Sequence, residues 1–230
     1  MTLQVIDLKC RCMVAPMIIS ISGVDCAGKS TQIELLEAHL RQNGKQPQRM
    51  WYRPGYSPEL DSLRALIRKI RPNAIPTPGD SAQREKTFSN PKLQKRWATA
   101  AIWDTLLQYA LKLRGLNLIG KTIICDRYLQ DALLDLELRF PELNTRQWKS
   151  VKRLKSLCPE PDKAFLLMLP HDVFLERLIQ KNEPFPDAPE MRERRFLAYQ
   201  SLASTGNFIV INGDRPIADV QQSIVEALGQ

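Results

Sequence analysis

The chain has 230 residues, which is enough for one large α/β domain and too few for two comfortable ones. With 43% hydrophobic and 25% charged residues its composition is ordinary for a soluble domain, and no apolar run approaches the roughly 18 residues that span a membrane as a helix. The formal net charge of +8 favours an anionic partner, either a nucleic acid or a small molecule. However, the sequence has no basic run with interleaved aromatic residues, no zinc-finger spacing and no RNA-binding signature.

Residues 1–16 are expected to form a poorly ordered N-terminal extension without a function of its own, and residues 17–230 a single domain. The extension does not resemble a signal peptide, because Asp7, Lys9 and Arg11 interrupt any apolar core. The five cysteines are irregularly spaced, which favours reduced thiols and a cytoplasmic location.

Apolar, β-rich runs alternate with stretches of helical periodicity along the rest of the chain. Strands are expected at Ile18–Ser22, Arg49–Tyr52, Thr122–Cys125, Ala164–Leu169 and Phe208–Ile211. Helices are expected at Ser30–Asn43, Pro58–Ile70, Leu93–Leu113, Asp131–Phe140, Arg146–Leu157, Val173–Lys181, Pro189–Ala203 and Ile217–Leu228. This alternation predicts an α/β fold, a five-stranded parallel sheet with helices on both faces, which binds ligands beyond the carboxyl ends of its strands.

Two segments lack a regular period. Residues 71–92 are rich in proline and polar residues, and residues 181–195 combine three prolines with four cations. Irregular segments of this length inside a compact domain are usually mobile flaps or disordered insertions.

The stretch 23–31 reads GVDCAGKST and lies between the first expected strand and the first expected helix. It matches the pattern G-x-x-x-x-G-K-[ST], a P-loop, whose glycines let backbone N–H groups cradle phosphate oxygens at the positive end of a helix. Lys29 is expected to reach the β- and γ-phosphates, and the Ser30 hydroxyl can ligate Mg²⁺. The motif predicts a nucleoside triphosphate site made of Gly23, Val24, Asp25, Cys26, Ala27, Gly28, Lys29, Ser30 and Thr31.

Candidate ligand-binding side chains also follow the second and third expected strands. Asp126 ends the third strand, where an acid near a P-loop positions Mg²⁺ or caps a helix. Arg127 suits a two-pronged grip on an acceptor phosphate, or an ion pair with Asp126 or Asp131. Arg53, after the second strand, has the same candidate role or lies on the surface, and Tyr128 fits the core as well as it fits a ligand contact.

The cations of the second irregular segment, Lys181, Arg192, Arg194 and Arg195, are expected either to close over the triphosphate or to form a solvated helix face. Asp25 is unexpected in a phosphate-binding loop, because a carboxylate repels phosphate unless it faces elsewhere. It can hold a hydroxyl of the second substrate.

Several stretches, taken in order, resemble the thymidylate kinases, a family of nucleoside monophosphate kinases. They are the P-loop with Asp25 and Thr31-Gln32, Arg53-Pro54-Gly55, Asp126-Arg127-Tyr128, Pro161-Asp162, Leu175-Glu176-Arg177-Leu178 and Arg192 to Tyr199. The resemblance covers about residues 17–228. It implies a P-loop NTPase fold with ATP and Mg²⁺ as cofactors, and a role in nucleotide biosynthesis. It also implies an acceptor-side loop at 71–92 and a lid at 181–195.

The resemblance also implies roles for single residues. Lys29, Asp126, Arg127, Lys181 and Arg192 would be catalytic, with Ser30 and Asp126 at the metal. From their chemistry or from the resemblance, the residues expected at the acceptor are Asp25, Arg53, Trp103, Arg127, Tyr128 and Asp135. The turn Asn212 to Pro216 would lie where the family packs the adenine. The expected partners are small nucleotides, with no nucleic acid and no membrane, and a homodimer is left open.

The sequence departs from the family at three places. Cys26 stands where one branch carries an arginine that helps in transfer, so Lys181 or Arg192 would have to supply that charge. The stretch 99–104 has no arginine for the acceptor, although Trp103 can stack on a base or, as a helical aromatic residue, pack in the core. Asp135 stands where the family has a tyrosine that disfavours a 2′-hydroxyl, which suggests a hydroxylated acceptor or one other than thymidylate.

The favoured hypothesis is an ATP-dependent phosphotransferase acting on a nucleoside monophosphate, whose phosphate needs no general base. A P-loop kinase with a hydroxyl acceptor is the main alternative, with Asp25 or Asp126 as the base. A non-catalytic nucleotide-binding protein and a nucleic-acid-binding protein remain as further alternatives. The last of these predicts a cluster of Lys and Arg away from the ATP loop.

Overall fold

The computed structural model describes residues 16–54, 69, 90–181 and 188–229. The expected helix at 58–70 and the expected loop at 71–92 lie outside the described residues, except for Lys69 and residues 90–92. Residues 1–15 of the expected extension and residues 182–187 of the expected lid lie outside them too.

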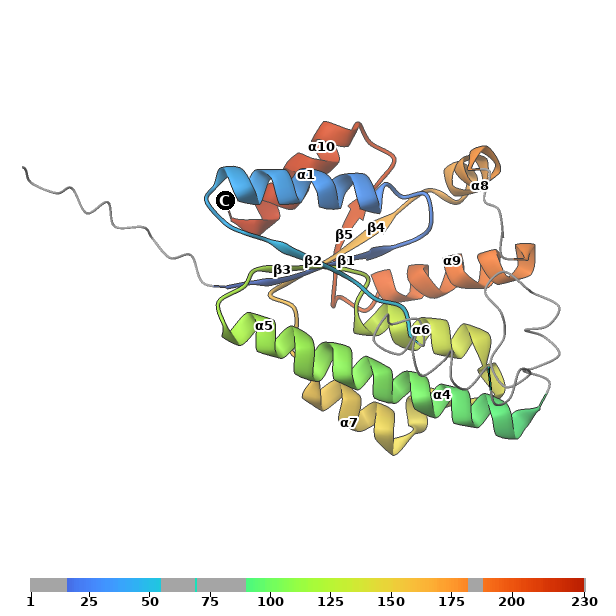
Figure 1. Ribbon diagram of the computed structural model, residues 1–230. Coiled ribbons are helices and arrows are strands. Elements are labelled where there is room, and N and C mark those ends of the chain that lie inside the picture. Colours follow the sequence, from blue (N-terminus) through green and yellow to red (C-terminus); the bar gives the residue numbers. More distant parts are fainter. Residues whose placement is uncertain (1–15, 55–68, 70–89, 182–187, 230) are drawn as a thin grey trace, which may run out of the picture.

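A parallel sheet forms the centre of the fold (Figure 1). Its strands are β1 (Ile18–Gly23), β2 (Gln48–Trp51), β3 (Ile123–Asp126), β4 (Lys163–Met168) and β5 (Ile209–Asn212), arranged in the order β2-β3-β1-β4-β5. Every neighbouring pair is parallel, with Ser20 beside Cys125 and Ala164. Each expected strand is present, and its bounds differ by at most one residue at either end. The α/β fold with a five-stranded parallel sheet is confirmed.

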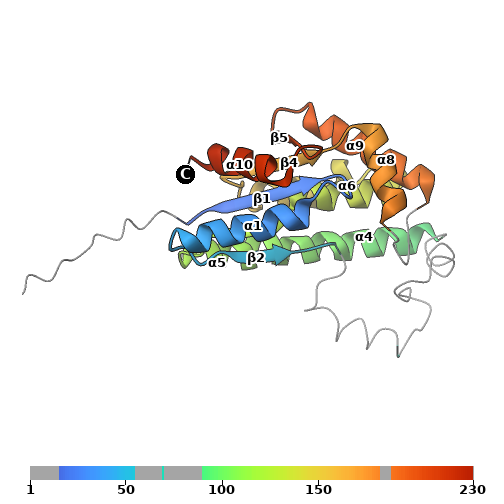
Figure 2. The same ribbon diagram turned by 90° about the horizontal axis from the view of Figure 1, so that it is seen from above.

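Helices cover both faces of this sheet, as Figures 1 and 2 show. The helices α1 (Lys29–Gln42) and α10 (Ile217–Leu228) lie on one face. The other face carries α4 (Pro91–Thr105), α5 (Arg114–Leu118), α6 (Leu129–Arg139), α7 (Lys149–Leu157) and α9 (Pro189–Ala203). The helix α8 (His171–Gln180) follows β4 at the carboxyl end of the sheet. All six residues of β1 are buried, because this strand lies in the middle of the sheet with both faces covered.

The core consists of two apolar clusters. One packs side chains of α1, α9 and α10 against β1 and β4, with Ile33, Leu36 and Phe165 fully buried. The other packs α4, α6 and α7 against β3. Among the described residues, no helix combines the length and the apolar character needed to cross a membrane.

The helix expected at Leu93–Leu113 is longer and is not uniform. It begins at Pro91, where the Asn90 side chain accepts a hydrogen bond from the Lys92 N–H, and it runs on through α5 to Leu118. Between α4 and α5, Leu106–Leu113 form a π-helix, labelled η2, which buries Tyr109 completely. The Tyr109 hydroxyl donates a 3.4 Å hydrogen bond to the carbonyl of Arg127. This segment therefore supports the backbone at the end of β3.

The chain between α6 and α7 also differs from expectation. Two 3₁₀ turns, Pro141–Leu143 and Thr145–Gln147, precede α7, and Trp148 is extended with a ψ of 137°. The helix expected at Arg146–Leu157 therefore begins at Lys149.

Candidate active site

The GVDCAGKST stretch links β1 directly to α1, as the sequence predicts. Gly23 has a φ of +143°, and a Cβ there would lie 2.1 Å from the Leu167 carbonyl oxygen of β4, so only glycine fits. Cys26 adopts a φ of +63°, which is uncommon for a residue other than glycine, and it marks a tight curve in the loop. Val24 and Ala27 are buried beneath the loop, whereas Gly28, Ser30 and Thr31 are exposed above it.

A cavity of about 530 Å³ opens above this loop at the carboxyl end of the sheet. It is lined by Asp25, Cys26, Gly28, Lys29, Ser30, Thr31, Trp51, Asp126, Arg127, Arg177, Gln180 and Lys181. Most candidate residues of the P-loop thus meet Asp126 at the end of β3, Arg127 just after it and Lys181 at the end of α8. The cavity is mainly polar and carries six cationic or acidic side chains that suit a phosphate ester and a metal ion.

Lys29 is nearly buried, and its ammonium group folds over its own loop. The Nζ atom donates hydrogen bonds to the carbonyl oxygens of Val24 at 2.6 Å and Gly23 at 3.1 Å, and it lies 4.0 Å from Asp25 Oδ1. Burial, and next the positive charge of Arg127, lower the pKa of Lys29 to about 8. A bound triphosphate would stabilise the protonated amine that burial disfavours.

Asp25 faces Arg127 across the cavity. Arg127 Nη2 donates a 2.9 Å hydrogen bond to Asp25 Oδ1, so the carboxylate in the phosphate-binding loop is compensated by a guanidinium. Burial alone would raise the pKa of Asp25, but the charges of Lys29, Arg127, Arg195 and Lys181 together lower it below its ordinary value. The ion pair with Asp131 that the sequence left open is much weaker, since Arg127 Nη1 lies 4.0 Å from Asp131 Oδ1.

Asp126 ends β3 as expected and is nearly buried. Its Oδ2 accepts a 2.5 Å hydrogen bond from Arg49 Nη2 of β2, a partner that the sequence did not suggest. Asp126 does not cap α6, because Tyr128 occupies that position. The Asp126 carboxylate and the exposed Ser30 hydroxyl line the same cavity. One carboxylate and one hydroxyl fit Mg²⁺, which prefers oxygen ligands and keeps several waters.

Asp131 and Tyr199, which the sequence did not assign to the site, hold Arg127 in place. Arg127 Nη1 donates a 2.9 Å hydrogen bond to the Tyr199 hydroxyl of α9, which in turn donates a 2.6 Å hydrogen bond to Asp131 Oδ1. The other oxygen of Asp131 accepts hydrogen bonds from Ser22 Oγ at 2.5 Å and from the Tyr128 N–H at 2.9 Å. Arg127 itself has a φ of +73°, so its guanidinium is oriented by a constrained backbone and by its hydrogen bonds to Tyr199 and Asp25.

Arg177 of α8 is another residue that the sequence did not place in the site, although it belongs to the stretch that resembles the family. Its guanidinium contacts the Cys26 carbonyl at 3.4 Å and the Gly213 carbonyl at 3.3 Å, and it donates a 2.9 Å hydrogen bond to Asp214 Oδ1. A Cβ on Gly213 would lie 2.8 Å from the Ala27 carbonyl, so the turn after β5 approaches the P-loop closely. Arg177 thus joins α8, the P-loop and this turn.

The acceptor-side candidates Arg53 and Asp135 do not line the P-loop cavity. They lie next to each other, with Arg53 Nε 3.3 Å from Asp135 Oδ2, and line a small pocket with Pro54, Trp97 and Arg139. Asp135 is only 9% exposed, and its second oxygen accepts a short hydrogen bond from Arg195 of α9. The expectation that Asp135 faces a sugar hydroxyl is not supported, because both of its oxygens contact arginines.

Three other candidates lie apart from the cavity. Tyr128 belongs to the core, with its ring against Tyr109 and its hydroxyl donating a 2.5 Å hydrogen bond to the Pro159 carbonyl. Trp103 is 59% exposed on α4 and is not among the cavity residues, so the structure does not support its stacking on a base there. Arg192 is half-buried on α9 and is not among the cavity residues either.

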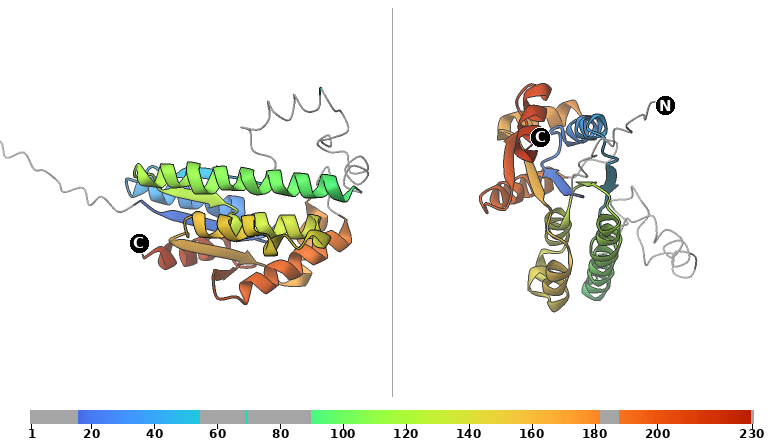
Figure 3. Two further views of the ribbon diagram at one scale, coloured as in Figure 1. Left: turned by 90° about the horizontal axis from the view of Figure 1, so that it is seen from below. Right: turned by 90° about the vertical axis from the view of Figure 1, so that its left-hand side faces the viewer.

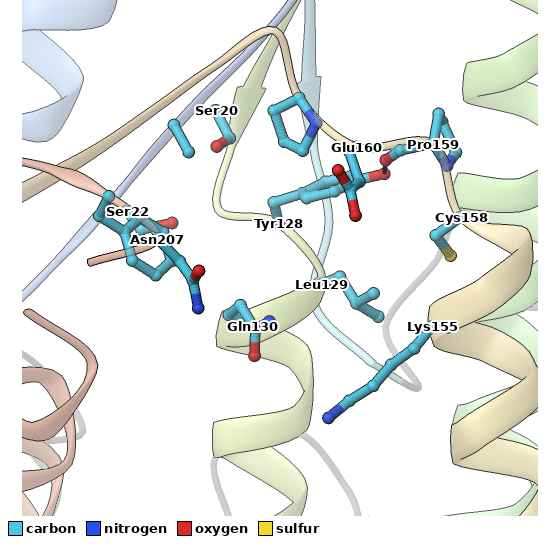
Figure 4. Close-up of a pocket in the computed structure, with 13 residues that line it drawn as sticks. Ser20, Ser22, Tyr128, Leu129, Gln130, Lys155, Cys158, Pro159, Glu160 and Asn207 are labelled. Carbon is cyan, nitrogen blue, oxygen red and sulfur yellow. Dashed lines mark hydrogen bonds between the residues drawn. The ribbon is translucent and has the colours of Figure 1, made fainter. Parts of the chain in front are cut away.

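A second cavity of about 340 Å³ lies on the face of the sheet that carries α6 and α7 (Figure 4). Small side chains of the sheet, Ser20 and Ser22, form its floor, and Tyr128, Cys158 and Lys155 stand around it. Burial raises the pKa of the Cys158 thiol to about 12, so this cysteine is not a reactive thiolate. Apart from Tyr128, no candidate site residue lines this cavity.

No protein-family model matches the chain. The chain is similar to a thymidylate kinase of Dinoroseobacter shibae, with 26% identity over 226 residues that cover 92% of this chain and 95% of the relative. A thymidylate kinase of Desulfovibrio desulfuricans is 26% identical over 216 residues, which cover 89% and 91%. A probable thymidylate kinase 2 of Saccharolobus solfataricus is 31% identical over 128 residues, which cover 48% and 58%. The first two similarities extend over nearly the full length of both chains, which supports membership of the thymidylate kinase family.

Proposed function

We propose that the protein transfers the γ-phosphoryl group of ATP to a nucleoside monophosphate, with Mg²⁺ as the second cofactor. The observation that supports this most is the single cavity that combines the P-loop lysine with the Asp25–Arg127 pair and Asp126. Relatives named thymidylate kinase over nearly the whole chain support the same activity. The acceptor itself stays open, because the residues expected around its sugar and base differ from the family.

Phosphoryl transfer depends mainly on positioning and charge neutralisation. The loop N–H groups, the start of α1 and Lys29 would bind the triphosphate. Ser30 and Asp126 would hold Mg²⁺, which neutralises charge on the phosphates. Lys181, which lines the cavity, and Arg192 remain the candidates for the cation that Cys26 cannot supply.

The acceptor phosphate would bind Arg127, whose guanidinium lies in the cavity beside the P-loop. A phosphate acceptor is largely dianionic at neutral pH, since its second pKa is about 6, and therefore needs no general base. A hydroxyl acceptor does need one. The low pKa of Asp25 and its hydrogen bond to Arg127 make it a weak base, which favours the phosphate acceptor.

Coupled ADP release against nucleoside monophosphates, nucleosides and sugars tests the proposal. We expect activity with at least one monophosphate and none above background with the Lys29→Ala variant. Turnover with nucleosides or sugars alone would support the hydroxyl-acceptor kinase, and ATP binding without turnover on any acceptor would support a non-catalytic protein.

We also propose that the protein forms a homodimer. Trp103, Leu107 and Leu111 follow one another at four-residue intervals along α4 and η2 and are 59%, 47% and 62% exposed. An apolar stripe of this kind marks an interaction surface, and a second copy would cover the same stripe on both chains. Light scattering should show a dimer that Leu111→Glu converts to a monomer with unchanged thermal stability. A monomeric wild type at tens of micromolar would contradict this proposal.

We propose that the enzyme is cytoplasmic and has no nucleic-acid partner. One surface feature, however, favours the alternative that the protein binds nucleic acid. The helix α7 exposes Lys149, Lys152, Arg153 and Lys155 and lies across the sheet from α1 (Figure 3). This is the cluster away from the ATP loop that nucleic-acid binding predicts. Salt-dependent DNA or RNA binding that Lys152→Glu weakens would support that second function.

A further inference from the structure

Arg127 lies near two acids, one in the P-loop cavity and one in the core. Its Nη2 donates a 2.9 Å hydrogen bond to Asp25 Oδ1, and both residues line the cavity. Its Nη1 lies 4.0 Å from Oδ1 of Asp131, whose side chain is only 2% exposed and does not line the cavity. The guanidinium can therefore pair with either acid, and the pair with Asp25 is the one that keeps it beside the P-loop.

The Tyr199 hydroxyl stands between Arg127 and Asp131. It accepts a 2.9 Å hydrogen bond from Arg127 Nη1 and donates one of 2.6 Å to Asp131 Oδ1. Burial, and next the charge of Asp131, raise the pKa of this hydroxyl, so it keeps the proton that it donates. The Tyr199 ring is fully buried in the core beneath the sheet, which fixes the place of the hydroxyl.

Asp131 is a buried carboxylate that needs a donor on each of its oxygens. Its Oδ2 accepts hydrogen bonds from Ser22 Oγ at 2.5 Å and from the Tyr128 N–H at 2.9 Å. Within the described part of the chain, the donor to Oδ1 is the Tyr199 hydroxyl alone. Without this hydroxyl a buried carboxylate oxygen would have no partner, which is costly. Arg127 Nη1 lies 4.0 Å away and would reach hydrogen-bond distance by moving about 1 Å.

We propose that Tyr199 is a positioning residue of the phosphotransferase, whose hydroxyl keeps Arg127 from pairing directly with Asp131. The guanidinium then stays beside Asp25 in the P-loop cavity, where it can bind the phosphate of the acceptor. Tyr199 does not line this cavity and acts through Arg127. This role rests on the proposed function and adds to it a residue of α9 to which the sequence assigned no role.

The test is Tyr199→Phe, which keeps the buried ring and removes only the hydroxyl. On the best monophosphate acceptor we expect the acceptor KM to rise about tenfold, as for one weakened charge-assisted hydrogen bond, with the ATP KM changed less than about threefold. The matched control is Tyr52→Phe, since Tyr52 is 3% exposed and its hydroxyl lies 2.9 Å from Thr105 Oγ1, outside the cavity. Tyr52→Phe should leave both KM values unchanged. An unchanged acceptor KM in Tyr199→Phe, or an equal rise in both variants, would overturn the proposal.

The double variant Tyr199→Phe with Asp131→Asn separates the spacing role from a general loss of hydrogen bonds. The amide has no net charge, so it attracts the Arg127 guanidinium much less than the carboxylate does. Arg127 should then return to Asp25, and the acceptor KM should fall to within about threefold of the wild-type value. An acceptor KM at least as high as that of Tyr199→Phe, in a double variant that still unfolds cooperatively, would overturn the spacing role.

Crystal structures of the wild type and of Tyr199→Phe test the place of Arg127 without turnover and without the double variant. If the wild type phosphorylates no monophosphate, the proposed function fails, but these structures still report on Tyr199. We expect Arg127 to lie within hydrogen-bond distance of Asp131 in the variant, with its hydrogen bond to Asp25 lost. A guanidinium that remains on Asp25 in the variant would overturn the positioning role.

Discussion

The burial of Lys29 in the P-loop should lower the stability of the protein by an amount that depends on pH. Its pKa is about 8 in the folded protein against 10.5 in the unfolded chain, mainly because its ammonium group is buried. At 1.36 kcal/mol per pKa unit, the charged form is disfavoured by about 3 kcal/mol on folding. The variant Lys29→Met keeps the stem of the side chain and removes the charge. Below pH 8 the variant should therefore be more stable than the wild type, by at most about 3 kcal/mol. The gain in unfolding free energy is reduced by the loss of the two hydrogen bonds from Lys29 to the Gly23 and Val24 carbonyls.

The sign of the pH dependence follows from proton counting. Between pH 8 and 10.5 the unfolded chain keeps the Lys29 proton while the folded protein has lost it, so stability due to this group rises with pH. The advantage of Lys29→Met should shrink by about 1.4 kcal/mol per pH unit above pH 8. Urea unfolding of both proteins at pH 7, 8, 9 and 10 measures it, and other titrating groups cancel in the difference. A difference that stays constant over this range would refute the reasoning.

Three further predictions concern the surrounding contacts. Gly213→Ala should raise the ATP KM about tenfold, since the added Cβ would lie 2.8 Å from the Ala27 carbonyl oxygen. Gly115→Ala, whose Cβ would have no atom within 4 Å, should leave the ATP KM unchanged. Equal ATP KM values in the two variants would contradict the close approach. Asp126→Asn should raise the Mg²⁺ concentration needed for half-maximal turnover at least tenfold, whereas an effect on the acceptor KM alone would argue against a metal role. Burial would raise the pKa of Asp135, but Arg195 and Arg53 hold it below 3.8, so its stabilising contribution is present above that value and is lost as the pH falls through the folded pKa. Unfolding from pH 6 to pH 2.5 should therefore be more acid-sensitive in the wild type than in Asp135→Asn, and parallel curves would contradict the ion pairs.

Local patterns in the sequence were sufficient for the strands, most helices and the phosphate-binding loop. The β-rich runs alternate with helical periods, and right-handed βαβ connections allow few arrangements for such a series. The P-loop motif is equally readable from the sequence, although the close approach of β4 to Gly23 is a tertiary contact. The π-helix at Leu106–Leu113 was not predictable in this way, because it follows from how Tyr109 packs beneath Arg127.

Only the tertiary structure decided which charges meet. Arg127 and Asp25 are 102 positions apart, and Arg195 and Asp135 are 60 apart, so no local period relates them. The sequence left open whether Arg127 grips a phosphate or pairs with Asp126 or Asp131, and the family resemblance placed Asp135 near a sugar, because no local pattern identifies a distant partner. Burial makes an unpaired charge costly, so the fold brings acids and arginines of distant segments together. The chain alone thus determines a phosphate-binding loop on a parallel sheet, while the packing of α6 against α9 determines how the acceptor-side arginines are held.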